Sequence, residues 1–330
     1  MFAAHTGLGR FVPGELGVTI FFFLSGYLIT TLMRSEFERT GSVNLAHFWL
    51  RRALRILPPF YLVVLTATLM ALVLYPPGTV HGPAMVAELL FYANYWGIYG
   101  VNNEVPGTGV VWSLAVEEHF YLLFPLLYVG MQKWAVPRKR HAWLLWGLCA
   151  TVLAWRCVLV LAMHATSPRI YLATDTRIDS ILFGCALAIW NNPVSDKPKQ
   201  APILRKYLVL PAALVALLLC LIYRRAVFAE VWSFSVQGAA LTVLFIYAVQ
   251  DHKKPLFRIL NYRPVVFIGV LSYSLYLVHD IFLRAVAHLW PQWHGWQRAV
   301  IAMAASMIVA WTIYEVVERP CARLRKRLTD

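Results

Sequence analysis

The sequence predicts an all-α protein, a polytopic bundle of transmembrane helices, on three observations. The 330-residue chain is 60% hydrophobic and only 14% charged, which is more apolar than soluble domains are. Apolar stretches of about 20 residues recur along it, the length that a helix needs to cross a hydrocarbon core roughly 30 Å thick. No strand-like alternation of polar and apolar residues competes with them. We therefore expect residues 1–330 to form one transmembrane domain.

Nine full spans are predicted from the apolar stretches. They cover residues 15–33, 56–75, 110–130, 142–163, 177–190, 207–223, 231–250, 264–287 and 297–317. Residues 84–100 are shorter, rich in aromatic side chains and flanked by Pro and Gly, which favours a helix that lies in the membrane interface. Residues 1–13 look like the outer half of a truncated first helix, so we expect a partial helix there.

The orientation of the bundle follows from the basic residues, because membrane proteins concentrate Lys and Arg in cytoplasmic loops. Alternate loops and the tail 318–330 hold 22 of the 30 Lys and Arg residues. We expect these segments, including the C-terminus, on the cytoplasmic side of the membrane. The net charge of +14 is then explained by basic loops that set the orientation of the protein and face anionic lipids. No nucleic-acid partner is expected.

No metal site or disulfide framework is expected. The five cysteines form no CxxC pair and fall mostly inside apolar stretches, whereas zinc sites and disulfide scaffolds use characteristic spacings. The histidines are likewise scattered along the sequence.

Ionisable side chains inside the spans are the first functional candidates, because charges in lipid are costly and usually face the interior of the bundle. In the third span Ser113, Glu117 and Tyr121 recur every four residues and therefore share one helix face. Glu117 is the candidate catalytic carboxylate. The alternative is a structural seam of hydrogen bonds between helices.

Three more polar residues are predicted in the outer half of the membrane. Arg177 and Asp179 fall at the outer mouth of the fifth span, where they could shape the entry of a substrate or form an ion pair at a helix start. His279 comes late in the eighth span, which runs outward. It is either a substrate-binding group or a histidine that contacts a neighbouring helix.

On the cytoplasmic side, Arg52 and Arg55 are three residues apart before a proline pair, so that their side chains share a helix face. Guanidinium groups suit the geometry of phosphate. The two arginines are thus either a phosphate-binding site or an anchor on anionic lipid headgroups.

Five segments together resemble, in order, the signatures of the acyltransferase-three family of integral membrane acyltransferases. They are GVTIFFFLSGYLIT (17–30), FWLRRALRILPPF (48–60), WSLAVEEHFYLLFPLL (112–127), ATDTRIDSILFGCALA (173–188) and SYSLYLVH (272–279). Members of this family modify O-antigen, exopolysaccharide, Nod factors and macrolides. Thr19 stands where the family commonly has an aspartate.

The resemblance implies a function and a set of site residues. Acetyl-CoA from the cytoplasm would be the acyl donor, His5 in the first helix the catalytic group, Arg52 and Arg55 the family's RxxR element, and Glu117 its characteristic glutamate. The expected activity is transfer of an acyl group, acetyl above all, to a hydroxyl of an extracytoplasmic or lipid-linked glycan of the cell envelope. The alternatives are a transporter or flippase and a catalytically impaired, truncated homologue.

The expected mechanism places the donor and the chemistry at different depths. Arg52 and Arg55 would hold the phosphates of acyl-CoA, with Arg55 at the inner surface and Glu117 roughly 20 Å further into the membrane by the rise of a helix. His5 would act as general base on the acceptor hydroxyl, with Glu117 orienting its imidazole. Tyr121 and Tyr276 are candidates for contact with the reacting carbonyl oxygen.

Overall fold

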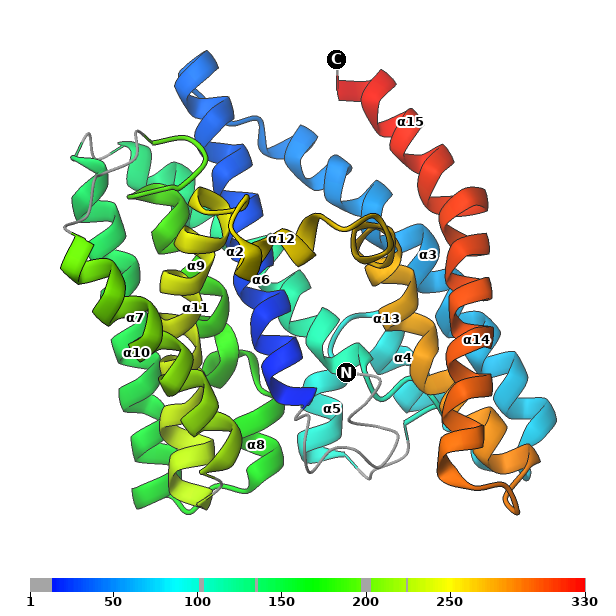
Figure 1. Ribbon diagram of the computed structural model, residues 1–330. Coiled ribbons are helices and arrows are strands. Elements are labelled where there is room, and N and C mark those ends of the chain that lie inside the picture. Colours follow the sequence, from blue (N-terminus) through cyan, green and yellow to red (C-terminus); the bar gives the residue numbers. More distant parts are fainter. Residues whose placement is uncertain (1–13, 101–103, 134–135, 197–202, 224, 330) are drawn as a thin grey trace. The chain divides into compact units, whose positions relative to one another are not determined.

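The structure is a computed structural model that describes residues 14–100, 104–133, 136–196, 203–223 and 225–329 (Figure 1). All regular elements in these ranges are helical, as the sequence predicts. They are α2 (Gly14–Thr40), α3 (Leu45–Leu74), α4 (Gly82–Leu89), α5 (Ala93–Tyr99), α6 (Val111–Lys133), α7 (Arg138–Cys157), η2 (Val158–Ala162), α8 (Ser167–Leu172), α9 (Thr174–Ile189), α10 (Ile203–Ile222), η3 (Phe228–Trp232), α11 (Ser233–Gln250), α12 (Pro255–Arg258), η4 (Ile259–Asn261), α13 (Arg263–Leu289), α14 (Gly295–Ile313), η5 (Tyr314–Glu318) and α15 (Arg319–Thr329).

Seven helical segments are long and apolar enough to cross a membrane, which makes the chain an integral membrane protein. They are Gly14–Thr40, Leu45–Leu74, Val111–Lys133, Arg138–Ala162, Phe228–Gln250, Arg263–Leu289 and Gly295–Leu328. The two other predicted spans also fall on helices, α9 with 16 residues and α10 with the apolar stretch Leu208–Ile222. The full count of nine spans therefore stays a prediction.

The helices extend well beyond the predicted hydrocarbon spans. α3 begins at Leu45, where the Asn44 side chain accepts a hydrogen bond of 3.0 Å from the His47 backbone N–H. The basic stretch that follows is made of good helix formers, so it continues the helix instead of forming a loop. Pro58 and Pro59 lie inside α3 without ending it.

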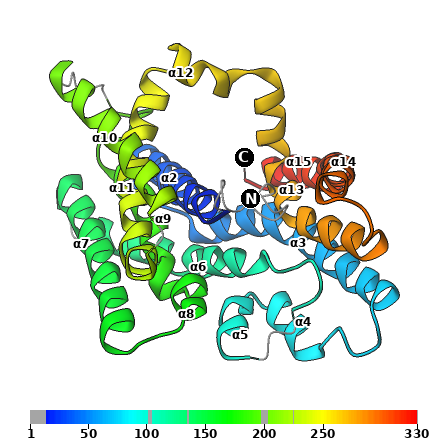
Figure 2. The ribbon, with the colours of Figure 1, turned by 60° about the horizontal axis from the view of Figure 1, so that its bottom comes forward.

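The aromatic stretch 84–100 contains two short helices in place of one. α4 and α5 contact each other (Figure 2), and residues 90–92 connect them in the sequence. Phe91 adopts a left-handed backbone conformation with a φ of 57°, which a regular helix cannot accommodate. Neither helix is long enough for a span, as predicted, and their place in the membrane interface stays a prediction.

The chain divides into two compact units. Among the described residues, unit 1 comprises 14, 44–100, 104–122 and 266–329, and unit 2 comprises 15–43, 123–133, 136–196, 203–223 and 225–265. In unit 1 a buried core runs from α3 to α13 and α14, with Phe60 stacked on Phe91 at 4.5 Å between ring centroids. In unit 2, α9 packs against α7 and α11.

Within unit 2, α2 and α9 approach so closely that only glycine fits at the contact. A Cβ atom on Gly184 would lie 2.0 Å from the Phe23 carbonyl oxygen, and one on Gly26 would lie 2.1 Å from the Ile181 carbonyl oxygen. Small residues permit this kind of backbone contact between membrane helices. The contact fixes how α2 lies against α9.

Replacing Gly184 by valine is expected to destabilise unit 2 by about 3 kcal/mol, because overfilling a packed contact forces the backbones apart. Thermal unfolding of the detergent-solubilised protein measures the loss. The matched control is Gly147→Val on α7, where an added Cβ meets nothing within 4 Å. An equal loss in both variants would mean that helix propensity and not the close contact dominates.

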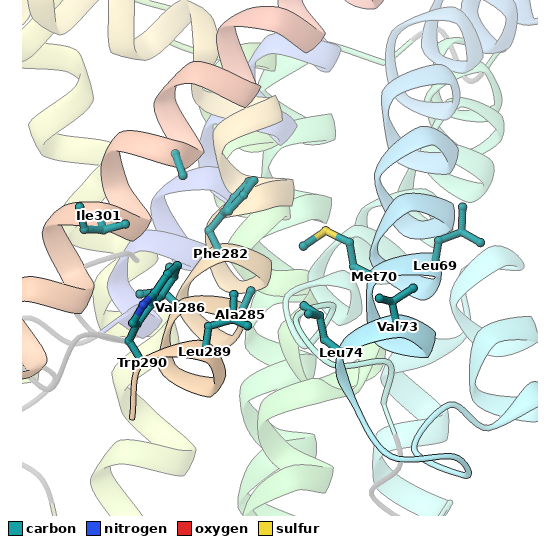
Figure 3. A pocket seen from close by; sticks show the side chains of 11 residues that line it. Leu69, Met70, Val73, Leu74, Phe282, Ala285, Val286, Leu289, Trp290 and Ile301 are labelled. Atoms are coloured by element: carbon teal, nitrogen blue, oxygen red, sulfur yellow. The ribbon is translucent and has the colours of Figure 1, made fainter. Parts of the chain in front are cut away.

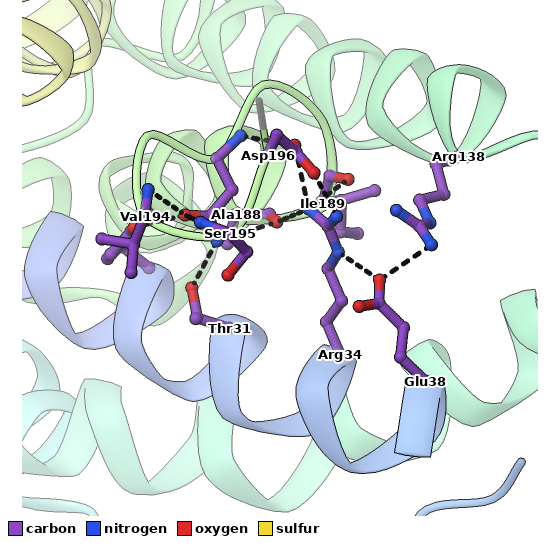
Figure 4. Close-up of polar contacts among 11 residues, drawn as sticks. Thr31, Arg34, Glu38, Arg138, Ala188, Ile189, Val194, Ser195 and Asp196 are labelled. Carbon is purple, nitrogen blue, oxygen red and sulfur yellow. Dashed lines mark hydrogen bonds and ion pairs between the residues drawn. The ribbon is translucent and has the colours of Figure 1, made fainter. Parts of the chain in front are cut away.

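The basic end of α2 is held by a buried arginine. Arg34 donates to the Ala188 and Ile189 carbonyl oxygens at 3.0 and 3.2 Å, which are terminal acceptors of α9. Figure 4 shows the same guanidinium between Asp196 and Glu38, with Glu38 bonded to Arg34 at 2.8 Å. The hydrogen bonds from Arg34 hold the pKa of Asp196 below its usual range.

Candidate functional site

The polar face predicted for α6 is buried in unit 1. Ser113, Glu117 and Tyr121 are 0%, 2% and 5% exposed, respectively, whereas Glu118 and His119 on the adjoining face are half-buried. The shared face of these three residues is therefore confirmed. The sequence alone distinguishes Glu117 from Glu118 because one residue turns a helix by about 100°.

Tyr276 of α13 meets this face, as expected of a site residue. Its hydroxyl shares a hydrogen bond of 2.5 Å with Ser113 Oγ and lies 2.9 Å from the Val110 carbonyl oxygen, to which it donates. Val110 directly precedes α6. The contact therefore holds the first turn of α6, and with it Glu117, against α13.

His279 lies one turn further along α13 and is 2% exposed. Its Nδ1 is 2.7 Å from the Tyr276 carbonyl oxygen. Because a carbonyl only accepts hydrogen bonds, this contact places a proton on Nδ1, and in the neutral ring Nε2 then carries the lone pair. His279 is thus a buried histidine whose basic nitrogen is Nε2.

Arg52 of α3 reaches the α6 face that carries Glu117. Its guanidinium carbon lies 5.6 Å from the centre of the Tyr121 ring, a cation–π distance, and it interacts electrostatically with Glu117. The Trp49 indole N–H donates to the Tyr121 carbonyl oxygen at 3.0 Å and fixes the two helices against each other. Arg52 and Glu117 therefore belong to one site, and the distance of roughly 20 Å expected between Arg55 and Glu117 stays a prediction.

Arg55, one turn further along α3, is exposed and belongs to a basic cluster. Its charge interacts with that of Arg325 on α15, which also faces Arg51, and α15 packs along α3. The sequence predicts only a basic tail for residues 318–330 and does not single out Arg325 as a site residue. The amphipathic pattern of that tail was the signal that a helix would place one of its arginines on α3.

α13 makes two polar contacts that the sequence does not predict. Tyr273 donates to the Ile56 carbonyl oxygen at 2.9 Å, and Ser274 hydrogen-bonds Glu318. Glu318 interacts electrostatically with Arg55, whereas Arg319 pairs with Glu315 at 2.6 Å. The charges of Glu118, Glu117 and Glu318 all act on the Tyr273 hydroxyl, so Tyr273 lies near both α6 and Glu318.

A buried glutamate outside the spans fixes the loop that leads into α6. Glu88 of α4 is 3% exposed and accepts hydrogen bonds from the Thr108 hydroxyl at 2.6 Å and the Val105 N–H at 3.3 Å. Burial raises the pKa of Glu88 to about 7, with the Thr108 and Val105 hydrogen bonds opposing the shift. Burial also raises the pKa of Glu104 in the same loop.

Arg177, predicted at the outer mouth of the fifth span, is fully buried in unit 2. Its guanidinium carbon lies 3.7, 5.3 and 5.7 Å from the ring centres of Phe234, Tyr171 and Phe22. Its hydrogen bond to the Thr19 hydroxyl is 3.3 Å long. Aromatic faces thus take the place of a carboxylate partner.

Asp179 is also fully buried and pairs with Arg156, not with Arg177. Two hydrogen bonds of 3.0 and 2.7 Å join the Arg156 guanidinium to the two carboxylate oxygens. The Ser235 hydroxyl and the Ser180 N–H donate to the same carboxylate at 2.8 and 2.9 Å. Asp179 is therefore a satisfied ion-pair partner in the core of unit 2, and the expected contact with a substrate has no support in its surroundings.

Two further expectations concern His5 and metals. His5 lies outside the residues that the structure describes. Among the residues that it does describe, no group of three or more His, Cys, Asp or Glu side chains could hold a metal ion.

The structure has a buried carboxylate beside an arginine and hydroxyl groups inside a helical membrane bundle. Charged groups in this position are typical of two classes of protein, membrane enzymes and transporters. The comparison with known protein families distinguishes a membrane enzyme from a transporter. The chain matches the acyltransferase-three family, described as an acyltransferase domain, over residues 2–315, and it belongs to that family. The resemblance drawn from the five motifs is confirmed.

Curated relatives are O-acetyltransferases. The chain is 30% identical to the peptidoglycan O-acetyltransferase OatA of Listeria monocytogenes over 96% of its own length and 53% of that protein. It is also 30% identical to the O-acetyltransferase OatA of Staphylococcus aureus, over 81% of its length and 45% of that protein. The chain thus spans about half the length of these relatives. No solved structure matches it.

Proposed function

We propose that the chain transfers an acetyl group from cytoplasmic acetyl-CoA to a hydroxyl of an extracytoplasmic glycan. The printed activity of the relatives, O-acetylation and in one case O-acetylation of peptidoglycan, supports both the group and the acceptor class. The single observation that carries the proposal is the cluster in which Arg52 lies over Tyr121 and interacts with Glu117. It brings a candidate donor-binding group to the candidate reaction centre.

Arg52 and Arg55 are the proposed binding groups for the phosphates of the donor. Arg55 is exposed at the basic end of α3, and Arg51 and Arg325 add positive charge beside it. Guanidinium groups bind phosphate oxygens through paired N–H donors. Arg52 extends this cluster toward Tyr121, so that the thioester of a bound donor would point into the site.

The proposed reaction is a direct transfer in which His5 acts as general base. His5 takes the proton of the acceptor hydroxyl, and the oxygen attacks the thioester carbonyl carbon. The carbon–sulfur bond then breaks, and the departing CoA thiolate takes the proton back from the imidazolium. Glu117 stabilises the positive charge on the imidazole while it holds the proton.

Three more residues of the same site are proposed to contact the acceptor and the reacting carbonyl. Tyr121 is a candidate donor to the carbonyl oxygen as it gains negative charge. Tyr276 is a second candidate, and its single O–H would then leave the Val110 carbonyl oxygen, to which it donates in the structure. His279, with its basic nitrogen at Nε2, is a candidate acceptor for a second hydroxyl of the glycan. Arg177 and Asp179 are instead proposed to hold unit 2 together, because both are fully buried there.

The phosphate-binding role is tested by the double variant Arg52→Ala with Arg55→Ala. It is expected to raise KM for acetyl-CoA by on the order of tenfold to a hundredfold, because two charge-assisted hydrogen bonds are lost. The measurement is transfer of labelled acetyl to a soluble peptidoglycan fragment by membranes that carry the chain. With acetyl-pantetheine, which has no nucleotide, the variant and the unaltered protein are expected to have similar KM values.

Control variants distinguish phosphate binding from general positive charge. Arg323→Ala with Arg327→Ala removes two exposed arginines of α15 and is expected to leave KM for acetyl-CoA within about twofold. If KM for acetyl-CoA is unchanged in the Arg52 and Arg55 variant, the two arginines would instead serve as an anchor on anionic lipid headgroups. Movement of an intact solute across the membrane without acetyl transfer would support a transporter in place of an enzyme.

His5→Ala tests the assignment of the base. Loss of a positioned general base is expected to lower kcat by about 10²–10⁴-fold, measured by the same acetyl transfer at matched amounts of membrane-inserted protein. Undiminished transfer by a well-expressed His5→Ala protein would overturn the role of His5 while leaving the donor site intact.

A further inference from the structure

Unit 2 carries a large apolar groove that the transfer reaction does not use. Its volume is about 880 Å³, and α2, α10 and α11 line it with residues such as Phe23, Leu214, Leu241 and Phe245. The groove follows one face of α11 from Leu241 to Val249, which is roughly 12 Å at 1.5 Å per residue. This length is close to the half-thickness of a hydrocarbon core, about 15 Å.

The groove ends at a basic hollow. Just beyond α11 a second depression of about 700 Å³ is lined by Lys253, Arg258 and Arg263, and Asn261 lines both spaces. The three basic side chains are exposed and have no ion-pair partner among the described residues. Lys254, next in sequence, is paired to Asp251 at 3.0 Å. Of the four basic residues in this loop, the three that form no ion pair with a described residue are therefore those that line the hollow.

We propose that the groove and the hollow together form a binding site for one anionic phospholipid. An acyl chain would fill the groove along α11, and the phosphate would lie among Lys253, Arg258 and Arg263. The charge and the length both support this occupant: a phosphate complements three unpaired cations, and the groove is as long as one leaflet is deep. The loop that holds the cations is one of those expected on the cytoplasmic side.

A second apolar groove lies in unit 1 and differs from the first in the charge around it. It has a volume of about 580 Å³ and is lined by α3, α13 and α14, with Met70, Phe282 and Trp290 facing it (Figure 3). Arg284, on the same stretch of α13, is bonded to Asp280 at 3.0 Å. This groove lacks a cluster of unpaired cations among its lining residues and is expected to accept lipid chains without regard to headgroup.

The test is native mass spectrometry of the purified protein with defined lipids. The detergent-solubilised chain is titrated with phosphatidylglycerol or phosphatidylcholine of identical acyl chains, and the bound lipids are counted. We expect the unaltered protein to retain phosphatidylglycerol on the order of tenfold better, given the attraction of each basic residue for anionic lipid. Replacing Lys253, Arg258 and Arg263 by alanine is expected to abolish this preference.

Two further variants make the result specific to the site. Ala248→Trp fills the groove and is expected to lower retention of phosphatidylglycerol while the three cations remain. Arg284→Ala removes a basic residue beside the unit 1 groove and is expected to change nothing. Equal retention of the two lipids by the unaltered protein, or the same preference in the triple variant, would overturn the proposal. Displacement of the lipid by equimolar long-chain acyl-CoA would also overturn it, because the space would then be a donor site.

Discussion

Replacing Glu117 by glutamine is expected to lower the rate of acetyl transfer by about 10³-fold, the loss typical of removing a preorganised charge from a buried reaction centre. Glutamine has the same shape, so the packing of α6 against α13 is preserved. What is lost is the negative charge that faces Arg52 and would stabilise an imidazolium. Acetyl transfer from labelled acetyl-CoA, normalised to the amount of folded protein, measures the effect.

Glu118→Gln is the matched control for this prediction. The two glutamates are adjacent in sequence, but Glu118 lies on the neighbouring face and is half-buried, whereas Glu117 is 2% exposed. We expect Glu118→Gln to reduce transfer by less than tenfold. Equal losses in both variants would mean that the total negative charge near Arg52 matters, and would remove the specific role given to Glu117.

Replacing Arg156 by alanine is expected to destabilise unit 2 by about 3–5 kcal/mol, the cost of leaving a buried charge without its partner. The change strands the Asp179 carboxylate, which is fully buried, and deprives it of two hydrogen bonds. Thermal or denaturant unfolding of the solubilised protein measures the loss.

Two comparisons separate the stranded charge from other effects. Arg138→Ala breaks a pair with Glu38 in which the side chains are 54% and 39% exposed, and it is expected to cost less than about 1 kcal/mol. Arg156→Met combined with Asp179→Leu removes both charges and is expected to recover most of the stability. A double variant as unstable as Arg156→Ala would show that the guanidinium packs the core independently of the carboxylate.

The sequence predicts the helices of this protein well because lipid leaves few alternatives. A backbone in hydrocarbon must satisfy its hydrogen bonds within the segment, so hydropathy alone locates the helix at each predicted span. The ends are less predictable. The helix over residues 45–55 depends on the Asn44 cap and on local helix propensity, and neither registers in a hydropathy window.

The site is predictable along one helix and not between helices. The spacing of Ser113, Glu117 and Tyr121 places them on one face of α6 without any knowledge of its neighbours. The contact of Tyr273 with Ile56 depends on how α13 is rotated against α3, which a single helix does not specify. For the same reason, the pairing of Asp179 with a residue of α7 and the placing of Arg325 beside Arg55 required the assembled structure.

The contact of α2 with α9 has a consequence for biosynthesis. Arg177 and Thr19, which meet at this contact, are 158 residues apart in the chain. A ribosome adding ~5–20 residues per second needs roughly 8–30 s to synthesise that length. For most of this interval α2 has already left the ribosome, and Thr19, Gly26 and Arg34 lack the surfaces that cover them in the finished protein. The time at which unit 2 can close is therefore set by translation, and a pause in synthesis before α9 would prolong the exposure of a buried arginine to the membrane.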